Sequence, residues 1–394
     1  MKAKEEARKL GRIGHEGRRN ILNFIAESLV DEGNVEAILK ANGEDLVEAE
    51  ERNIDPPLMK RLKLTKEKLE TLSKGIKQIS ASPNPLNVVK KSLEVSEGLN
   101  LTQLTVPIGV LMIIFESRPD SLPQIAALSI ASGNGLLLKG GKEARRSNEA
   151  LGNVIGNAIE RGSGGAVARE LVSLVSSRDE ISNLLKMDDC IDLVIPRGGN
   201  KLVQHIKSNT KIPVLGHADG VCHVYVASTA DKLKAAKIAV DAKTNYPAAC
   251  NAMETLLLHS DTLKNGVAEQ VLKELRQAGV KCLGAENAAR AGLTDVRSLS
   301  NKVEYGELTC QVEVVESTDA AVSWIHANGS GHTECIVTED KDEAEGFLAG
   351  VDAACVFHNA STRFADGFRF GMGAEVRFTE DRSDSDSSAS YLST

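Results

Sequence analysis

Hydrophobic positions near the start of the chain recur at mixed spacings of three and four, the period of amphipathic helices. Residues 5–33 carry this pattern, and residues 34–53 and 65–82 repeat it. Prolines within 55–64 suit the start of another helix, and Thr65 is placed to cap the helix that follows it. The sequence therefore predicts that the chain begins as a run of helices.

Between residues 88 and 116 the pattern changes to alternating and β-branched positions, which are typical of strands. We interpret this stretch as a hairpin-like pair of strands followed by a buried strand over 109–115. From there, apolar runs alternate with helical patterns, which predicts parallel α/β sheets. The further predicted strands are 135–140, 166–175, 190–196, 221–227, 254–259, 281–284, 310–316, 334–338 and 353–360.

The end of the chain differs from the rest. Residues 377–394 are rich in serine and aspartate and hold almost no apolar side chains. Such a composition cannot bury enough apolar surface to offset the entropy lost on ordering. We expect this segment to be disordered.

Composition adds limits on function. The chain has 394 residues, enough for two or three sub-domains, and its net charge of −8 argues against a non-specific grip on nucleic acid. No apolar run reaches the roughly 18 residues that a membrane span needs. The mixed-charge amino terminus lacks the apolar region of a secretory signal. These features favour a soluble protein that acts on small molecules.

The seven cysteines all lie beyond residue 189, and their odd number and lack of CxxC spacing argue against a disulfide scaffold. We therefore expect a reducing compartment, in which most of these cysteines are small buried hydrophobes. No cluster of histidine and cysteine has the spacing of a zinc site, so no metal is predicted.

Two glycine-containing turns after predicted strands are candidate phosphate sites. Gly198 and Gly199 stand between a strand and a helix, where free N–H groups favour a phosphate, although a plain tight turn explains them equally well. Lys139 ends another buried strand and is followed by Gly140, Gly141 and Lys142. Ligands of open α/β sheets bind at the carboxyl ends of strands, so this turn suits a ribose and a 2′-phosphate. A solvated basic helix start is the alternative.

Ser117 and Arg118 follow the buried strand 109–115, and Pro119 is predicted to start a helix. A hydroxyl, a guanidinium and a helix N-terminus together suit an oxyanion or a carboxylate. An ordinary serine cap would account for the same residues.

Cys250 lies in the polar stretch "NYPAACNAME", ahead of the predicted strand 254–259. A lone cysteine is more often a core residue than a nucleophile, but its small neighbours leave room for a substrate. No histidine or aspartate is identifiable as its base. The spacing alone leaves both interpretations open.

Six long stretches, in order along the chain to about residue 376, carry a family resemblance. They are "PIGVLMIIFESRPDSLPQIAALSIASGNGLLLKGGKEA", "IDLVIPRGGNKLVQ", "PVLGHADGVCHVYV", "YPAACNAMETLLLH", "GSGHTECIVTED" and "VFHNASTRFADGFRFGMGAEV". They resemble the gamma-glutamyl phosphate reductase family (glutamate-5-semialdehyde dehydrogenases), a branch of the aldehyde dehydrogenase superfamily. The wording is most similar to the reductase half of plant-type bifunctional synthases.

The resemblance implies an aldehyde-dehydrogenase-like α/β fold. A Rossmann-like NADP-binding domain would cover 1–88 and 106–225, an oligomerisation β-arm 89–105 and an α/β catalytic domain 226–376. The family usually continues with another strand where this chain has the atypical tail 377–394. An inactive or weakly active interaction subunit of the synthase is therefore an alternative to an active reductase.

The resemblance makes Cys250 the nucleophile. Its thiolate would attack L-glutamyl 5-phosphate and expel phosphate, and hydride from NADPH would reduce the thioester to L-glutamate 5-semialdehyde, on the route to proline. Oxidising members of the superfamily carry a water-activating glutamate where this chain has Val214, so the thioester is expected to await hydride rather than water.

The resemblance also assigns binding residues for the substrate. Ser117, Arg118 and the Cys250 N–H are expected to hold the oxyanion and the phosphate. Asn251 and Arg363 are further candidates for the substrate, although a structural salt bridge is an equal interpretation of Arg363.

For the cofactor, Lys139 matches the lysine that contacts the adenosine ribose. Lys142 stands where NAD-preferring members often have glutamate, which fits NADP, and Glu304 resembles the glutamate that contacts the nicotinamide ribose. The implied partners are further copies of the chain or glutamate 5-kinase activity, in the cytoplasm, with plastid or mitochondrion as alternatives.

Overall fold

The computed structural model describes residues 2–54, 56–115, 118–175, 178–197, 200–216, 219–294, 297–298, 300–366 and 369. The chain forms two compact units, one ending at Gly216 and the other beginning directly after it. The sequence placed this border after residue 225, but β7 (Cys222–Val226) pairs on both sides with strands of the second unit. The predicted tail 377–394 lies outside the described residues.

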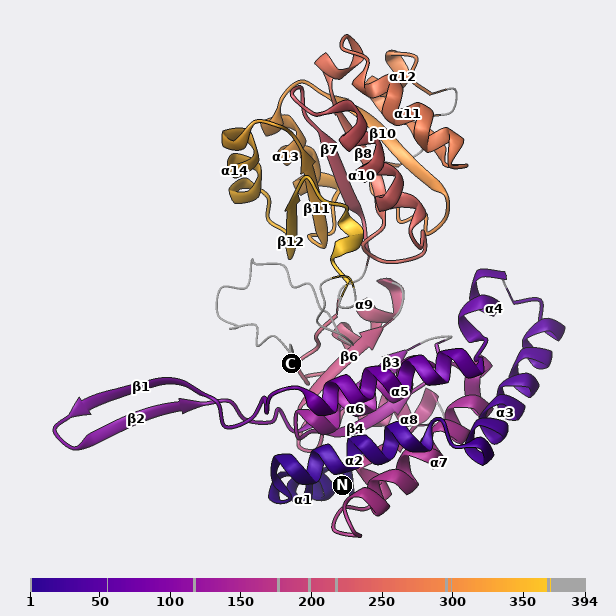
Figure 1. Cartoon of the computed structure of the whole chain (residues 1–394), viewed down its shortest axis with the longest axis vertical. Helices are drawn as coiled ribbons and strands as arrows, with labels where there is room; N and C mark the ends of the chain where they lie inside the picture. Colours follow the sequence, from indigo (N-terminus) through magenta and orange to yellow (C-terminus); the bar gives the residue numbers. More distant parts are fainter. Residues whose placement is uncertain are drawn as a thin grey trace. The chain divides into compact units, whose positions relative to one another are not determined.

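Helices open the first unit, as the spacing of apolar residues predicts (Figure 1). They are α1 (Lys2–Arg12), α2 (Gly14–Ser28), α3 (Glu32–Glu51), α4 (Pro56–Leu62) and α5 (Lys66–Ala81). The helical stretch expected over 5–33 is divided, because the φ of Gly14 is 69° and interrupts the right-handed backbone. Thr65 caps α5 as predicted, since its side chain accepts a hydrogen bond from the Lys68 N–H.

An antiparallel hairpin follows, formed by β1 (Val89–Ser96) and β2 (Leu99–Leu104). It confirms the predicted pair of strands. Every residue of both strands is exposed, including the apolar Leu93, Leu99 and Leu101. In Figure 1 the ribbon projects away from the helices of the first unit. Its apolar side chains therefore contribute to no core of this chain within the described residues.

The first unit also holds a parallel sheet of four strands in the order β5-β4-β3-β6. These are β3 (Val110–Phe115), β4 (Gly135–Lys139), β5 (Val172–Leu174) and β6 (Leu193–Arg197). The strand expected over 166–175 is shorter, because Arg169–Leu171 form a 3-10 turn. The connecting helices are α6 (Ser121–Ala131), α7 (Arg145–Gly162) and α8 (Arg178–Leu184), and α9 (Asn200–Asn209) follows β6. The chain adds β4 and β5 on one side of β3 and then β6 on the other, which makes β3 and β6 the topological switch point.

The second unit is built on six parallel strands in the order β12-β11-β7-β8-β10-β9. Besides β7 they are β8 (Met253–His259), β9 (Lys281–Gly284), β10 (Thr309–Val315), β11 (Thr333–Val337) and β12 (Cys355–His358). The helices are α10 (Lys232–Thr244), α11 (Val267–Gln277), α12 (Glu286–Arg290), α13 (Thr318–Asn328) and α14 (Lys341–Gly350). Leu256 and Leu258 of β8 pack with α10 and α11, while Leu257 packs with α13 and α14. The central strands are buried on both faces. They therefore also bury polar side chains, among them His223, Glu254 and Glu313.

Candidate active site

Cys250 lies in the loop between α10 and β8, at the amino edge of the second sheet. Tyr246 begins the turns of this loop with a φ of 62°, and the N–H groups of Ala249 and Ala252 continue them. Cys250 is partly exposed, whereas Cys222, Cys310 and Cys335 are buried. All seven cysteines are free thiols. Cys190, Cys282 and Cys355 share this partial exposure, so the turns of its loop, and not exposure alone, set Cys250 apart.

The main chain of Cys250 is in close contact with the segment that leads into β7. A β-carbon added to Gly220 would lie 2.7 Å from the Cα of Cys250, so only glycine fits at this position. Two residues further on, the Cys222 thiol donates to the Cys250 carbonyl at 3.3 Å. Burial raises the pKa of Cys222 well above its usual range, so this sulfur remains a protonated donor.

Arg363 holds both ends of the Cys250 loop. Its Nε donates to the Asn245 carbonyl at 2.6 Å, and its Nη1 donates to the side-chain oxygen of Asn251. Asn251 in turn donates to the Ala365 carbonyl at 2.6 Å. Both Arg363 and Asn251 are buried. The two residues predicted to contact substrate are thus engaged with each other and with the loop backbone, which gives them a structural task.

A buried ion pair and an exposed carboxylate support the same loop from another side. Lys243 Nζ and Glu254 Oε2 are 2.8 Å apart, and both side chains are fully buried. Burial raises the pKa of Glu254 to about 7, although Lys243 acts in the opposite direction. Glu254 Oε1 accepts from the Gly306 N–H at 3.2 Å, and Glu304 Oε2 accepts from the Gly220 N–H at 3.1 Å. Glu304, predicted for the cofactor, is therefore beside the segment that touches Cys250.

In the first unit, Lys139 lies buried at the carboxyl end of β4 and donates to the Gly140 carbonyl. A β-carbon on Gly140 would overlap the side-chain amide of Asn148, whose Oδ1 is buried and has no hydrogen-bond partner. Lys142 is exposed and begins the 3-10 turn Lys142–Ala144 that leads into α7. The turn thus combines a close backbone approach, an orphaned acceptor and a lysine at a strand end.

The rest of the basic run is engaged in ion pairs. Arg145 pairs with Glu149 along α7, and Arg146 binds Asp45 and Glu48 of α3. Two of the three basic residues after Gly141 are therefore bound by carboxylates of the first unit.

Arg118 is the described residue of the first unit in the predicted oxyanion group. It is partly buried after β3, and its carbonyl accepts from the Ser121 N–H, so α6 begins at Ser121 rather than at Pro119. Ser117, Gly198 and Gly199 lie outside the described residues. The carboxyl ends of β3 and β6 lie side by side at Phe115 and Arg197, at the switch point where α/β sheets bind ligands.

Val214 continues the first sheet beyond β6. It forms an isolated parallel bridge with Val194, and the Leu215 N–H donates to the Val194 carbonyl at 2.9 Å. Its side chain packs against the apolar cluster that includes Met112 and Ile206. No carboxylate therefore stands at the position where oxidising relatives are expected to activate water.

Sequence reasoning missed Gly220, Lys243 and Glu254. A signal was present for Glu254, since an acidic residue within the apolar run "METLLLH" needs a buried partner. No comparable signal existed for Gly220, because its role depends on a contact between distant segments.

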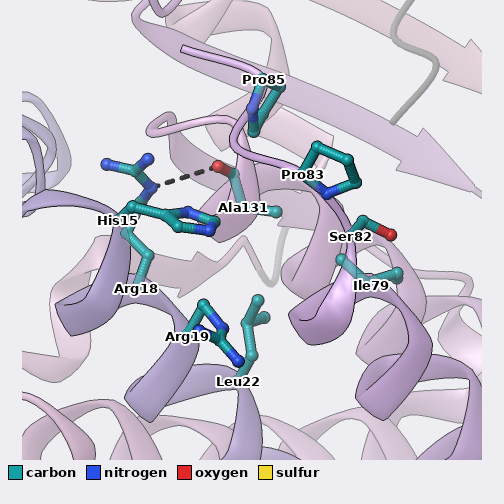
Figure 2. Close-up of a pocket in the computed structure, with 9 residues that line it drawn as sticks. All are labelled: His15, Arg18, Arg19, Leu22, Ile79, Ser82, Pro83, Pro85 and Ala131. Atoms are coloured by element: carbon teal, nitrogen blue, oxygen red, sulfur yellow. Dashed lines mark hydrogen bonds between the residues drawn. The ribbon is translucent and has the colours of Figure 1, made fainter.

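Elsewhere, the first unit has a small cavity near the segment that leads to β1, lined by His15, Arg18, Arg19, Leu22, Ile79, Ser82, Pro83, Pro85 and Ala131 (Figure 2). Its volume of about 10 Å³ has room for about one water. Within the described ranges, no group of three or more His, Cys, Asp or Glu side chains is placed to bind a metal ion. No helix in the described part of the chain is both long and apolar enough to cross a membrane.

Comparison with known proteins shows which family the chain resembles. No protein-family model matches the chain. Delta-1-pyrroline-5-carboxylate synthase A of Arabidopsis thaliana is 51% identical over 375 residues, which cover 95% of this chain and 51% of that protein. The chain thus spans about half the length of this relative. Gamma-glutamyl phosphate reductase of Parasynechococcus marenigrum is 45% identical over 368 residues, covering 93% of this chain and 83% of that protein.

Solved structures agree with the sequence relatives. Gamma-glutamyl phosphate reductase of Thermotoga maritima superposes with a TM-score of 0.88 at 32% identity, covering 96% of this chain and 93% of that one. An acetylating aldehyde dehydrogenase of Geobacillus thermoglucosidasius, at a TM-score of 0.64 and 17% identity, shares the fold and covers 92% of this chain and 85% of its own. With its partly exposed cysteine and two α/β units, this aldehyde-dehydrogenase-like chain belongs to the gamma-glutamyl phosphate reductase family.

Proposed function

We propose that this chain catalyses the NADPH-dependent reduction of L-glutamyl 5-phosphate to L-glutamate 5-semialdehyde, with release of phosphate, in proline biosynthesis. The observation that supports this best is Cys250, a partly exposed thiol on a loop that Arg363 and Gly220 hold in place. A nucleophile on a fixed loop can attack a bound acyl group without first paying the entropy of ordering.

In the first step the Cys250 thiolate attacks the acyl carbon of the substrate, forms a carbon–sulfur bond and displaces inorganic phosphate. The thioester then accepts hydride at its carbonyl carbon, and the carbon–sulfur bond breaks to release the aldehyde and the thiolate. Ser117, Arg118 and the Cys250 N–H are proposed to hold the oxyanion and the phosphate. Arg363 and Asn251 act by positioning the loop, since Arg363 binds its backbone at Asn245 and the two side chains bind each other.

NADPH, when bound, supplies the hydride. The residues at the carboxyl edge of the first sheet fit a nicotinamide dinucleotide. The buried Asn148 Oδ1 has no hydrogen-bond donor, and it lies beside Gly140, where a side chain would not fit. Lys139 would contact the ribose, and Lys142 would favour the 2′-phosphate of NADPH over NADH. Cofactor contacts are further proposed for Gly141, Gly198, Gly199 and Glu304.

Val214 supports reduction over oxidation. An NAD-dependent oxidiser would need a base to activate water against the thioester, and a valine packed into an apolar cluster cannot act as one. The thioester is therefore kept for hydride.

The acyl phosphate is an activated anhydride, so a glutamate 5-kinase activity must supply it, as the bifunctional relatives suggest. We further propose that the hairpin β1–β2 is an oligomerisation arm and that the chain works in a reducing compartment, the cytoplasm or an organelle. An inactive interaction subunit is not favoured, because the argument for it rests on the tail 377–394 alone.

The reverse reaction tests the proposal. Pyrroline-5-carboxylate (the cyclised semialdehyde), phosphate and NADP are supplied, and NADPH formation is followed by its absorbance, which reports hydride transfer. We expect phosphate-dependent NADPH formation in the wild type and its loss in Cys250→Ser. Full activity of Cys250→Ser would show that another group is the nucleophile, and NADPH formation without phosphate would show an ordinary aldehyde oxidiser.

A further inference from the structure

A buried ion pair near Cys250 has no part in the proposed chemistry. Lys243 is in the last turn of α10, Glu254 is on β8, and their charged atoms are 2.8 Å apart with both side chains fully buried. Charges are costly to bury, and replacing such a pair by apolar residues is often neutral or stabilising. Stability alone therefore gives no physical reason for a pair at this place.

The pair contacts a turn that is distant in sequence. Glu254 Oε2 binds Lys243, and Oε1 accepts from the Gly306 N–H at 3.2 Å. The Tyr305 N–H also bonds to this carboxylate and acts to lower its pKa. Gly306 has a φ of 63°, a backbone conformation that favours glycine. The ion pair thus fixes the backbone at Tyr305 and Gly306.

The next residue towards the amino terminus is Glu304, whose Oε2 accepts from the Gly220 N–H at 3.1 Å. Gly220 is so close to Cys250 that an added β-carbon would lie 2.7 Å from the Cys250 Cα. A continuous path of a hydrogen-bonded turn, a carboxylate and a backbone contact therefore joins Glu254 to the main chain of Cys250.

We propose that the Lys243–Glu254 pair is a positioning device for Cys250. By fixing the turn at Tyr305 and Gly306, it keeps Glu304 on the Gly220 N–H and so sets where the Cys250 main chain lies. The inference rests on the proposed function only in taking Cys250 as the reactive thiol. Lys243 and Glu254 act through the loop and not on the substrate. Glu304 does so through its bond to the Gly220 N–H, which is separate from its proposed cofactor contact.

Labelling of the full chain with iodoacetamide, read by mass spectrometry of the peptide that contains Cys250, tests this without substrate or cofactor. Loss of the support should let the loop open, so Glu254→Gln and Glu304→Ala are each expected to label Cys250 about tenfold faster, which corresponds to about 1.4 kcal/mol of loop opening. The buried Cys335 reports global unfolding and should label at the wild-type rate.

The double variant separates a shared path from two independent effects. If both residues act through one turn, Glu254→Gln with Glu304→Ala should label no faster than either single variant. In the reductase assay, kcat is expected to fall in all three variants with KM for the acyl substrate unchanged. Because labelling needs no turnover, a chain without reductase activity would leave this test intact.

Glu313 provides a matched control. It is a buried carboxylate on β10 that accepts from the N–H groups of Asn287 and Ala288 at the start of α12. Glu313→Gln should lower the melting temperature and leave Cys250 labelling unchanged.

Should Glu254→Gln not fold, Glu254→Asp keeps the charge beside Lys243 but shortens the reach to Gly306, and the same faster labelling is expected. The proposal would be overturned if Cys250 in the Glu254 or Glu304 variants labelled at the wild-type rate. It would also be overturned if the double variant increased the rate by the product of the two single effects.

Discussion

The turn after β4 and the loop before β8 both carry residues proposed for the reaction, but different contacts hold them. Gly140 packs against Asn148 in the helix that follows it, so the turn is organised by its near neighbours in sequence. The loop of Cys250 is held by Gly220 and Arg363, which belong to distant segments of the chain. The locally organised turn after β4 suits the binding of a cofactor. The loop held by distant segments suits a thiol that must stay in one place during the reaction.

The largest expected effect comes from Gly220→Ala. The added methyl group would overlap the main chain of Cys250, and overpacking of this kind costs ~1–3 kcal/mol. Because the displaced group is the nucleophile's own backbone, kcat/KM is expected to fall about a hundredfold. Steady-state kinetics and a melting curve measure both effects.

Gly43→Ala is the control for this change. Gly43 lies inside α3 and has open space where its β-carbon would be, so alanine should leave activity unchanged and raise stability by up to about 1 kcal/mol. Equal activity of the two glycine variants would mean that the contact at Cys250 does not matter.

Arg363→Met is expected to have the next largest effect. It removes the charge-assisted hydrogen bonds to Asn245 and Asn251, each worth ~1.5–3 kcal/mol. We expect kcat to fall about thirtyfold, with KM for the acyl substrate unchanged, because the guanidinium positions the loop. A rise in KM with kcat unchanged would instead return Arg363 to a substrate contact.

The support of the Cys250 loop is also expected to titrate. Burial raises the pKa of Glu254 from its usual value near 4.5 to about 7 in the folded chain, so between these values the folded state binds a proton that the unfolded state does not. The free energy of unfolding should therefore fall as pH rises through this window, by on the order of 2 kcal/mol. Denaturant melts at pH 5 and about pH 7.5 measure it, and Glu254→Gln should remove this part of the slope. Identical slopes in both proteins would contradict the raised pKa.

The smallest effect is predicted for the turn after β4. Lys142→Glu should weaken NADPH about tenfold and leave NADH nearly unaffected, because the side chain is exposed and faces only the 2′-phosphate in the proposed complex. The ratio of kcat/KM for the two cofactors measures this preference. Arg145→Glu tests the neighbour that already pairs with Glu149, and a similar change in cofactor preference there would show a diffuse field of charge instead of a contact.

The contrast between contacts of near neighbours and contacts of distant segments also explains which features the sequence could predict. Strands and helices follow from the local period of apolar residues, so the hairpin, the parallel sheets and the Thr65 cap are confirmed. The turn after β4 could also be found, because lysine, glycine and the strand end are adjacent in the chain.

The supports of Cys250 could not be predicted in this way. In the sequence, Gly220 looks like any other loop glycine, and only its contact with the Cys250 backbone sets it apart. The sequence around Arg363 would be the same whether its side chain bound a substrate or an asparagine. Local patterns fix which segments form, but the contacts between distant loops depend on how the six-stranded sheet brings its amino edge together. The family resemblance implies the chemistry proposed for Cys250, and the fold brings together the residues that hold its loop.

The exposed ribbon of β1 and β2 has a practical consequence for protein engineering. Its tip at Glu97 and Gly98 has a φ of 74° at Gly98 and belongs to no core among the described residues. Exposed tips of this kind tolerate cleavage and inserted sequence. A reporter peptide or a protease site placed there should leave the cores of both units folded. A circular permutant with its new ends at this tip would have them far from Cys250 along the chain.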